Sequence, residues 1–278
     1  MVAEPDADDF QGLVTALRRI HEQGWVYSRR LDKNGKTVPC NSSNCNGNTL
    51  EALLGIRSNG ISLPDYRGWE VKARQVVDSE SPGSSTVTLF TPEPNDGIYA
   101  YSGAESFIRK YGYEDTLGRE DRLNFGGIYR VNDEPHHRTG LRMVLDGYDA
   151  DAGHFEPDGS VRLIDKEGKS AAAWTFLKLM DHWKAKHAKA VFVPSQLREL
   201  TEREYRYGRK VLLGEGAEFR LFLRAIHEGK VYYDPGIKLE NVSSGRPSVK
   251  KRSQFRIRSG DLASIYISSS NLDVSSDE

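Results

Sequence analysis

Cysteine is scarce in this sequence: Cys40 and Cys45 are the only two among 278 residues. A disulfide-stabilised scaffold needs more cysteines than this. A structural zinc site needs four ligands, and no histidine lies close enough in the sequence to complete one. We therefore expect two reduced thiols in a loop.

Long hydrophobic runs are also missing. No apolar stretch approaches the roughly 20 residues needed to span a bilayer, and the acidic segment Met1–Asp9 lacks the basic and apolar blocks of a secretory signal. A hydrophobic content of 37% and a charged content of 28% are typical of a folded, soluble chain. These features predict a cytoplasmic protein with one large domain or two modest ones.

The sequence also lacks an excess of charge of one sign, because its formal net charge is −1. This value argues against a uniformly basic nucleic-acid-binding protein. The charge is unevenly distributed, however, since residues 198–258 contain 15 Lys/Arg and 8 Asp/Glu, a difference of +7. A DNA-binding surface needs a local basic patch only, so the C-terminal part is a candidate for it.

The most informative segment is Pro64–Lys72, which reads Pro-Asp-Tyr-Arg-Gly-Trp-Glu-Val-Lys. Glu70 and Lys72 are two positions apart, so they project from the same face of an extended strand. Gly68 permits a tight reversal that brings Asp65 back toward Glu70. Two converging carboxylates suit a hard divalent cation such as Mg²⁺, and a lysine beside it can orient a water or neutralise charge on a phosphate. The segment therefore indicates metal-dependent phosphodiester hydrolysis.

Simpler interpretations exist for these residues. Alternating charges such as those of Glu70 and Lys72 also mark the solvent-exposed face of a strand. Asn48 and Glu51 are spaced like a capping box at the start of a short helix. In a capping box, the glutamate side chain accepts a hydrogen bond from the backbone N–H of the cap residue. The residues alone leave both interpretations open.

The apolar pattern predicts a mixed α/β (α+β) fold with a β-rich second half. Helices are expected over residues 10–23, from 48 or 49 to 54, over 104–111 and over 171–186. Strands are expected over residues 190–193, over 219–226 and 231–233 as a hairpin, and over 262–267.

The acidic segment and its surroundings resemble the MvaI/BcnI family of restriction endonucleases. These are monomeric relatives of the mismatch-repair nicking enzyme MutH within the PD-(D/E)xK nuclease superfamily. The resemblance extends from about residue 10 to residue 267 and is strongest near the acidic segment. It is carried by Gly47–Ile56 with its Leu-Glu-x-x-Leu-Gly core, Asn59, Pro64-Asp65, Gly68-x-Glu70-x-Lys72, Arg122–Ile128, Pro235–Glu240 and Lys251–Ile257.

The resemblance implies a PD-(D/E)xK restriction-endonuclease-like core with a β-rich DNA-recognition lobe, and Mg²⁺ as the cofactor. It makes Asp65 and Glu70 metal ligands, and Lys72 the water-orienting base or electrostatic partner. It also favours Glu51 as an auxiliary acid, holding a second metal ion or an ordered water, over the capping role. Whether one or two ions act stays open.

The basic C-terminal part is expected to contact double-stranded DNA. Residues 255–258 alternate, which places Arg256 and Arg258, both candidate DNA-binding residues, on one face of a strand. Arg256 is the candidate for reading guanine in the major groove. The candidates for contacts to the DNA backbone are Lys238, Lys250, Lys251 and Arg252.

Two alternatives apply to the DNA-contact residues. The basic cluster also fits a solvated, charged strand edge. His136 and His137, in a predicted loop, touch DNA, assist at the scissile phosphate or are an ordinary exposed pair.

We expect a catalytic lobe over residues 1–195, a DNA-recognition lobe over 196–268 and a disordered tail over 269–278, with 100–167 assignable to either lobe. The leading hypothesis is a type II restriction endonuclease. It would be a monomer that cleaves duplex DNA at a short sequence by nicking each strand in turn, with a companion DNA methyltransferase in the same system. The alternatives are a MutH-like strand-nicking repair endonuclease and a non-catalytic DNA-binding protein whose nuclease site has decayed.

Overall fold

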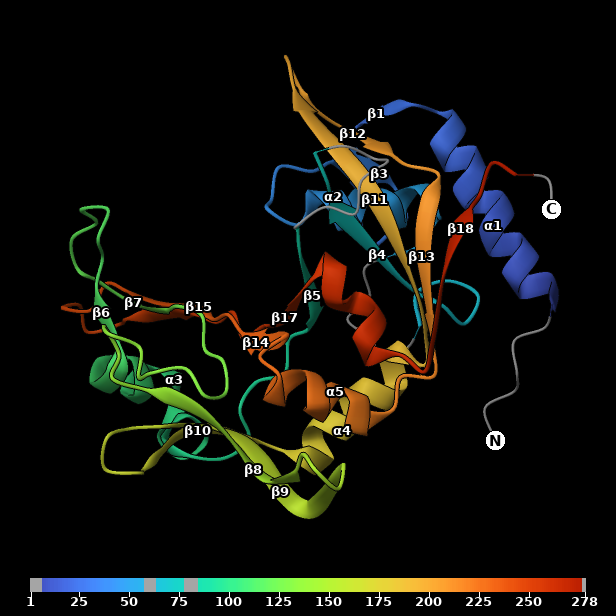
Figure 1. Cartoon of the computed structure of the whole chain (residues 1–278). Helices are drawn as coiled ribbons and strands as arrows, with labels where there is room; N and C mark the ends of the chain where they lie inside the picture. Colours follow the sequence, from blue (N-terminus) through green and yellow to red (C-terminus); the bar gives the residue numbers. More distant parts are fainter. Residues whose placement is uncertain (1–6, 58–63, 78–84, 277–278) are drawn as a thin grey trace. The chain divides into compact units, whose positions relative to one another are not determined.

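The computed structural model describes residues 7–57, 64–77 and 85–276 (Figure 1). Helix makes up 25% and strand 40% of the chain, which confirms the predicted mixed fold. The chain forms two compact units, each assembled from separate segments. Unit 1 contains the described residues up to 87, 183–218 and 258–276, and unit 2 contains 88–182 and 219–257.

Unit 1 is built on a six-stranded sheet in the order β1-β12-β11-β13-β18, with β4 pairing in parallel to β11. The strands are β1 (Trp25–Tyr27), β4 (Glu70–Gln75), β11 (Lys189–Glu199), β12 (Arg203–Tyr207), β13 (Lys210–Glu215) and β18 (Ser268–Asp273). The remaining elements are α1 (Ala7–Glu22), α2 (Cys45–Leu53), the 3-10 helix η1 (Ser259–Ile265), and the hairpin of β2 (Arg29–Leu31) and β3 (Thr37–Pro39).

The hydrophobic core of unit 1 holds β4 in place. Leu13, Leu17 and Ile20 form a buried stripe on α1, as their helical spacing predicts. They belong to one cluster with Val71 of β4 and Val191 of β11. Because side chains alternate along a strand, the burial of Val71 in this core directs Glu70 and Lys72 to the opposite face of the sheet.

Unit 2 contains three small sheets, in the orders β10-β9-β8, β14-β17-β5 and β16-β15-β7-β6. Three elements continue from one unit into the other: β5 (Thr86–Phe90), α4 (Phe176–His187) and, at its last residue, β17 (Phe255–Arg258). The other strands are β6 (Tyr113–Glu114), β7 (Arg122–Gly126), β8 (Arg142–Asp149), β9 (His154–Ile164), β10 (Ser170–Thr175), β14 (Val231–Tyr233), β15 (Gly236–Glu240) and β16 (Ser248–Lys250). The helices are α3 (Ile98–Tyr111), which is kinked at Gly103, and α5 (Phe219–His227).

Aromatic side chains dominate the interior of unit 2. The ring of Trp174 packs edge-on against Tyr233 and Phe255, with centroid distances of 4.6 and 5.2 Å. Its indole Nε1–H donates to the carbonyl oxygen of Pro92 at 2.9 Å, so its polar atom is satisfied although the side chain is buried. This cluster anchors β17 and therefore the register of the basic residues on it.

Three predicted elements are wrong. Residues 219–226 form helix α5 in place of a strand, since Phe219, Phe222 and Ile226 are buried at helical spacing. The 3-10 helix η1 covers most of the strand predicted over 262–267. The helix predicted over 171–186 begins only at Phe176, because residues 171–175 belong to strand β10.

The tail predicted to be disordered contains β18, which pairs antiparallel with β13. The side chains of β18 are mostly exposed, so nothing in their hydrophobicity signals a strand. What holds the segment is backbone pairing, together with Val274, which is fully buried. The Nε–H of Arg18 on α1 also donates to the carbonyl oxygen of Val274 at 2.7 Å.

The expectation of two reduced cysteines is also wrong, because Cys40 and Cys45 form a disulfide. Both lie in the unit 1 core, where Cys45 begins α2. The five-residue separation gave no sign that the chain between them folds back and brings the two Cα atoms to 5.6 Å.

The compact units do not follow the predicted contiguous lobes. Residues 88–182, which include the stretch assigned to either lobe, lie in unit 2 together with 219–257, whereas β12, β13 and β18 belong to unit 1. Within the described residues, no helix is long and apolar enough to cross a membrane.

Candidate active site

A tight turn precedes β4 and sets the geometry of the site. Tyr66 and Trp69 pair through two backbone hydrogen bonds of 3.0 and 2.8 Å. Between them Arg67 and Gly68 both have positive φ, 48° and 79°, a conformation that glycine adopts without strain. Trp69 is 2% exposed and packs on Phe10, so the turn is anchored in the core of unit 1. The reversal predicted at Gly68 is therefore present.

The turn returns Asp65 to the start of β4. Its Oδ2 accepts a hydrogen bond from the backbone N–H of Val71 at 3.1 Å. Burial, reinforced by the nearby negative charge of Glu70, raises the pKa of Asp65 from 3.8 to about 6. The two carboxyl groups thus converge, as the sequence predicts.

Glu70 and Lys72 extend from the same face of β4. Glu70 is 2% exposed, and the Nζ of Lys72 donates to its Oε1 at 2.8 Å. The ammonium group partly offsets the charge of the two neighbouring carboxylates. The structure therefore brings Asp65, Glu70 and Lys72 together at one end of a core strand.

The donor set of this site fits a hard divalent cation. Carboxylate oxygens are the ligands that Mg²⁺ prefers, and the repulsion that contributes to the raised pKa of Asp65 is what a cation held by Asp65 and Glu70 would relieve. Such a cation supplies Lewis-acid and water-activating chemistry when bound. The chain itself holds the two carboxylates and keeps the Lys72 ammonium beside them.

In the described part of the chain, Glu51 does not form a three-carboxylate metal-binding group with Asp65 and Glu70. Within residues 7–57, 64–77 and 85–276, no group of three His, Cys, Asp or Glu side chains is arranged to hold a metal ion. Helix α2, which carries Glu51, does pack beside β4. The structure thus places Glu51 on a neighbouring helix without adding it to a three-residue cluster.

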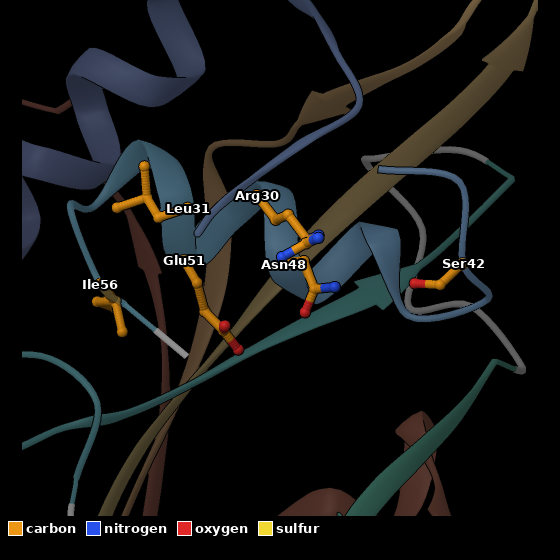
Figure 2. Close-up of a pocket in the computed structure, with 6 residues that line it drawn as sticks. All are labelled: Arg30, Leu31, Ser42, Asn48, Glu51 and Ile56. Carbon is orange, nitrogen blue, oxygen red and sulfur yellow. The ribbon is translucent and has the colours of Figure 1, made fainter. Parts of the chain in front are cut away.

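The capping interpretation of Glu51 is wrong. Helix α2 begins at Cys45 with Asn44 as its N-cap, so Asn48 is an interior residue. Glu51 instead lines a pocket of about 250 Å³ and projects from the same side of α2 as Asn48 (Figure 2). The other lining residues are Arg30, Leu31, Ser42 and Ile56.

The candidate DNA-backbone contacts of unit 2 lie on β15, on β16 and in the segment that directly follows β16. Lys238 of β15 pairs in register with Lys250 of β16, and burial and the positive charge of Arg122 lower the pKa of Lys238. The guanidinium of Arg252 occupies the space that a side chain at Gly236 would need. Lys250 also forms an ion pair with Glu240 at 2.6 Å, and the exposed Lys251 lies 3.8 Å from Glu93.

The alternation predicted for β17 is present. Phe255 and Ile257 are fully buried, while Arg256 is half-buried and Arg258 is exposed. The guanidinium of Arg256 donates from Nη1 to Asp234 Oδ2 at 2.5 Å, which fixes its orientation. Arg258 begins the last segment of unit 1, whereas Arg256 lies in unit 2.

Comparison with known proteins places these features in a family. A sequence model of the MvaI/BcnI restriction endonuclease family matches residues 14–266. The chain belongs to this family. Of the motifs that resemble it, Asn59 lies outside the described residues. Among curated proteins, no sequence matches the chain.

Two solved structures are similar to this family member. Restriction endonuclease MvaI in a complex with cognate DNA is 18% identical, with a TM-score of 0.72, over 96% of this chain and 99% of that chain. MvaI in the absence of DNA is also 18% identical, with a TM-score of 0.52, over 97% of this chain and 100% of that one. At this identity the likeness establishes the fold.

His136 has a packing role in this family member. Its ring fills the space above Gly127 and lies 5.2 Å from the ring of Tyr129. Burial, followed by the charges of His137 and Arg138, lowers its pKa. The His137 ring lies 4.8 Å from that of His136. A DNA contact by either histidine stays a prediction.

Two polar residues beside Lys238, Arg122 and Asn124, lie in a segment that resembles the family but received no role from the sequence. Asn124 of β7 pairs in register with Lys238, and it is held by hydrogen bonds to Arg122 at 3.0 Å and to Asp115 at 2.9 Å. They stand more than a hundred residues before Lys238, so the sequence gave no sign of this contact beyond the polar alternation Arg122-Leu123-Asn124 and the family resemblance of the segment.

Proposed function

We propose that this chain is a Mg²⁺-dependent type II restriction endonuclease that hydrolyses phosphodiester bonds of duplex DNA at a short specific sequence. It acts as a cytoplasmic monomer that nicks each strand in turn, with a companion DNA methyltransferase in the same system. The observation that carries the proposal is the convergence of Asp65, Glu70 and Lys72, with Lys72 Nζ 2.8 Å from Glu70 Oε1, in a member of this family.

Each residue has a defined role in the proposal. Asp65 and Glu70 hold the metal ion, and the Lys72 ammonium orients the attacking water or offsets negative charge developing on the phosphate. Glu51, on the helix beside β4, is the auxiliary acid for a second ion or an ordered water. Its position in a polar pocket, and the placement of the helix N-cap at Asn44, support this role over an N-capping one.

The DNA contacts divide between positioning and recognition. Arg256, oriented by Asp234, reads guanine, because a fixed guanidinium can donate two parallel hydrogen bonds to one base. The backbone contacts come from Lys238, Lys250, Lys251, Arg252 and Arg258. The basic surroundings of Lys238 support this assignment, since a cluster of like charges is stabilised by a polyanion.

Incubation of the purified protein with plasmids of known sequence, with and without Mg²⁺, tests the proposal. We expect discrete fragments that require the metal, preceded by nicked circles. Sequencing the fragment ends gives the recognition site and the position of the cut. Nicked circles that never become linear indicate a strand-nicking repair enzyme, and binding without any cleavage indicates a non-catalytic DNA-binding protein.

A further inference from the structure

Arg74 continues the row of functional side chains on β4. It follows Lys72 by two positions, so it projects from the same sheet face as Glu70 and Lys72. Their partners on β11 are Ala190, Phe192 and Pro194 in the parallel register. At about 3.3 Å per residue, the Cα of Arg74 lies about 7 Å beyond that of Lys72 along the strand.

Arg74 is a buried cation. It is 9% exposed, and its Nε is buried without a hydrogen-bond partner. Among the described residues, no carboxylate forms an ion pair with it, and burial lowers its pKa. Arg256, which is assigned to base recognition, differs because its guanidinium is ion-paired with Asp234.

A partly desolvated guanidinium without a counter-ion reduces the stability of the folded protein. Because such a group does not stabilise the fold, its presence is best explained by an anionic ligand that binds it. Guanidinium groups bind phosphate with two parallel hydrogen bonds, and such bonds strengthen in a partly desolvated place. Near Lys72, the anion that the proposed function brings is the DNA backbone.

We propose that Arg74 binds a phosphate of the cleaved DNA strand next to the bond that is hydrolysed, and so positions that strand along β4. This inference rests on the proposed function. It assigns to β4 a second task besides holding the carboxylates and the lysine: the strand carries a row of contacts that aligns the substrate with the site.

Binding and stability of Arg74→Met test the inference together, because they are expected to change in opposite directions. In the metal-free protein, where DNA is not cleaved, affinity for duplex DNA should fall about 10-fold or more. The slope of log affinity against log salt should decrease by about 1. The midpoint of thermal unfolding of the free protein should rise by about 2–4 °C, because the uncompensated buried charge is gone.

Arg203→Met is the matched control. Arg203 lies in the same unit on β12 and is ion-paired with Glu199 at 2.7 Å, so its loss should leave the salt slope unchanged and should not raise the unfolding temperature. Arg74→Lys keeps the charge without the planar donors. It should retain the salt slope of the wild type while losing part of the affinity.

A second experiment locates the phosphate once the recognition site is known. Single methylphosphonate substitutions remove one backbone charge at a time. Neutralising the phosphate that Arg74 contacts should weaken wild-type binding about 10-fold, and should have a clearly smaller effect on Arg74→Met or, if that variant fails to fold, on Arg74→Gln.

The inference is overturned if Arg74→Met binds DNA with wild-type affinity and salt slope, or if the methylphosphonate effects are the same in wild type and variant at every position. Failure of the proposed function is a separate result. A wild-type protein that binds DNA but never cleaves it removes the nuclease proposal, while the comparison of salt slopes still decides the role of Arg74.

Discussion

The ammonium group of Lys72 lies 2.8 Å from Oε1 of Glu70, a carboxylate that is almost fully buried. Asp65 lies close enough to Glu70 that the charge of Glu70 contributes to raising the pKa of Asp65. A fold that gathers two repelling carboxylates and a lysine at one end of a core strand does so at a cost in stability. The arrangement supports the proposal that these groups bind a cation and a phosphate.

Lys72→Met should abolish most of the cleavage and leave DNA binding nearly intact. We expect the cleavage rate to fall by about 100-fold or more, because the group that offsets charge at the phosphate is lost. The free energy of unfolding should also fall by about 2 kcal/mol, since Glu70 stays buried beside Asp65 without its cation. Single-turnover cleavage and urea unfolding measure the two effects. Lys36→Met, an exposed residue of the β2–β3 loop, is the control, and equal losses in both variants would contradict the assignment.

The stability of the metal-free protein should depend on the ionisation of Asp65. Burial and Glu70 raise the pKa of Asp65 to about 6 from 3.8, so the native state binds this proton more tightly than the unfolded state. The contribution of Asp65 to stability is therefore greatest at low pH, and it is lost as the pH rises from about 4 to about 6. Asp65→Asn should remove this part of the pH dependence, which urea unfolding at about pH 5 and pH 7.5 measures.

The stabilisation of the folded protein by Mg²⁺ should have the opposite pH dependence. Metal ions bind the ionised carboxylates, so saturating Mg²⁺ should raise the unfolding temperature more at about pH 7.5 than at about pH 5. In Asp65→Asn this gain should be much smaller. A gain of the same size in the wild type and in Asp65→Asn would mean that the cation binds elsewhere.

Glu51→Gln should separate the catalytic from the structural role of this residue. Because Asn48 is not a helix cap, the substitution should leave the free energy of unfolding within about 0.5 kcal/mol of wild type, whereas loss of a capping box costs about 1 kcal/mol. Cleavage should fall about 10-fold or more if Glu51 is the auxiliary acid. A variant with wild-type cleavage kinetics would remove Glu51 from the site.

Recognition and backbone contacts should respond differently to substitution. Arg256→Lys should relax discrimination at one base pair by about 1–3 kcal/mol, because lysine cannot replace the bidentate guanidinium held by Asp234. Lys250→Gln should weaken binding to all sequences alike and reduce the salt slope by about 1. Competition binding with single-base variants of the recognition site distinguishes them, and a uniform loss in Arg256→Lys would place this residue on the backbone.

The active-site segment was predictable because its signals are local. Gly68 fixes the turn and the two-residue spacing fixes the shared face of Glu70 and Lys72, so the convergence with Asp65 follows from a few backbone angles. The helix α1 was predictable for a similar reason, since its apolar stripe is regular and long.

The elements that failed depend on distant partners. Phe219–His227 is apolar at most positions, which suited a strand, although its Leu, Arg and Ala residues favour the helix α5 that the structure contains. Ala171–Trp174 is buried throughout, and a buried strand and a buried helix look alike in sequence. The tail joins the sheet through backbone bonds to β13, and the burial of Arg74 without a carboxylate appears only when the strands are assembled.

Cleavage by Asp65→Ala, assayed beside the wild type on the same plasmid with Mg²⁺, tests the central claim most directly. We predict discrete fragments from the wild type and none from the variant, while gel-shift experiments without metal give similar DNA affinities for both. Fragments produced by Asp65→Ala at the wild-type rate would contradict the claim that Asp65, Glu70 and Lys72 form the hydrolytic site.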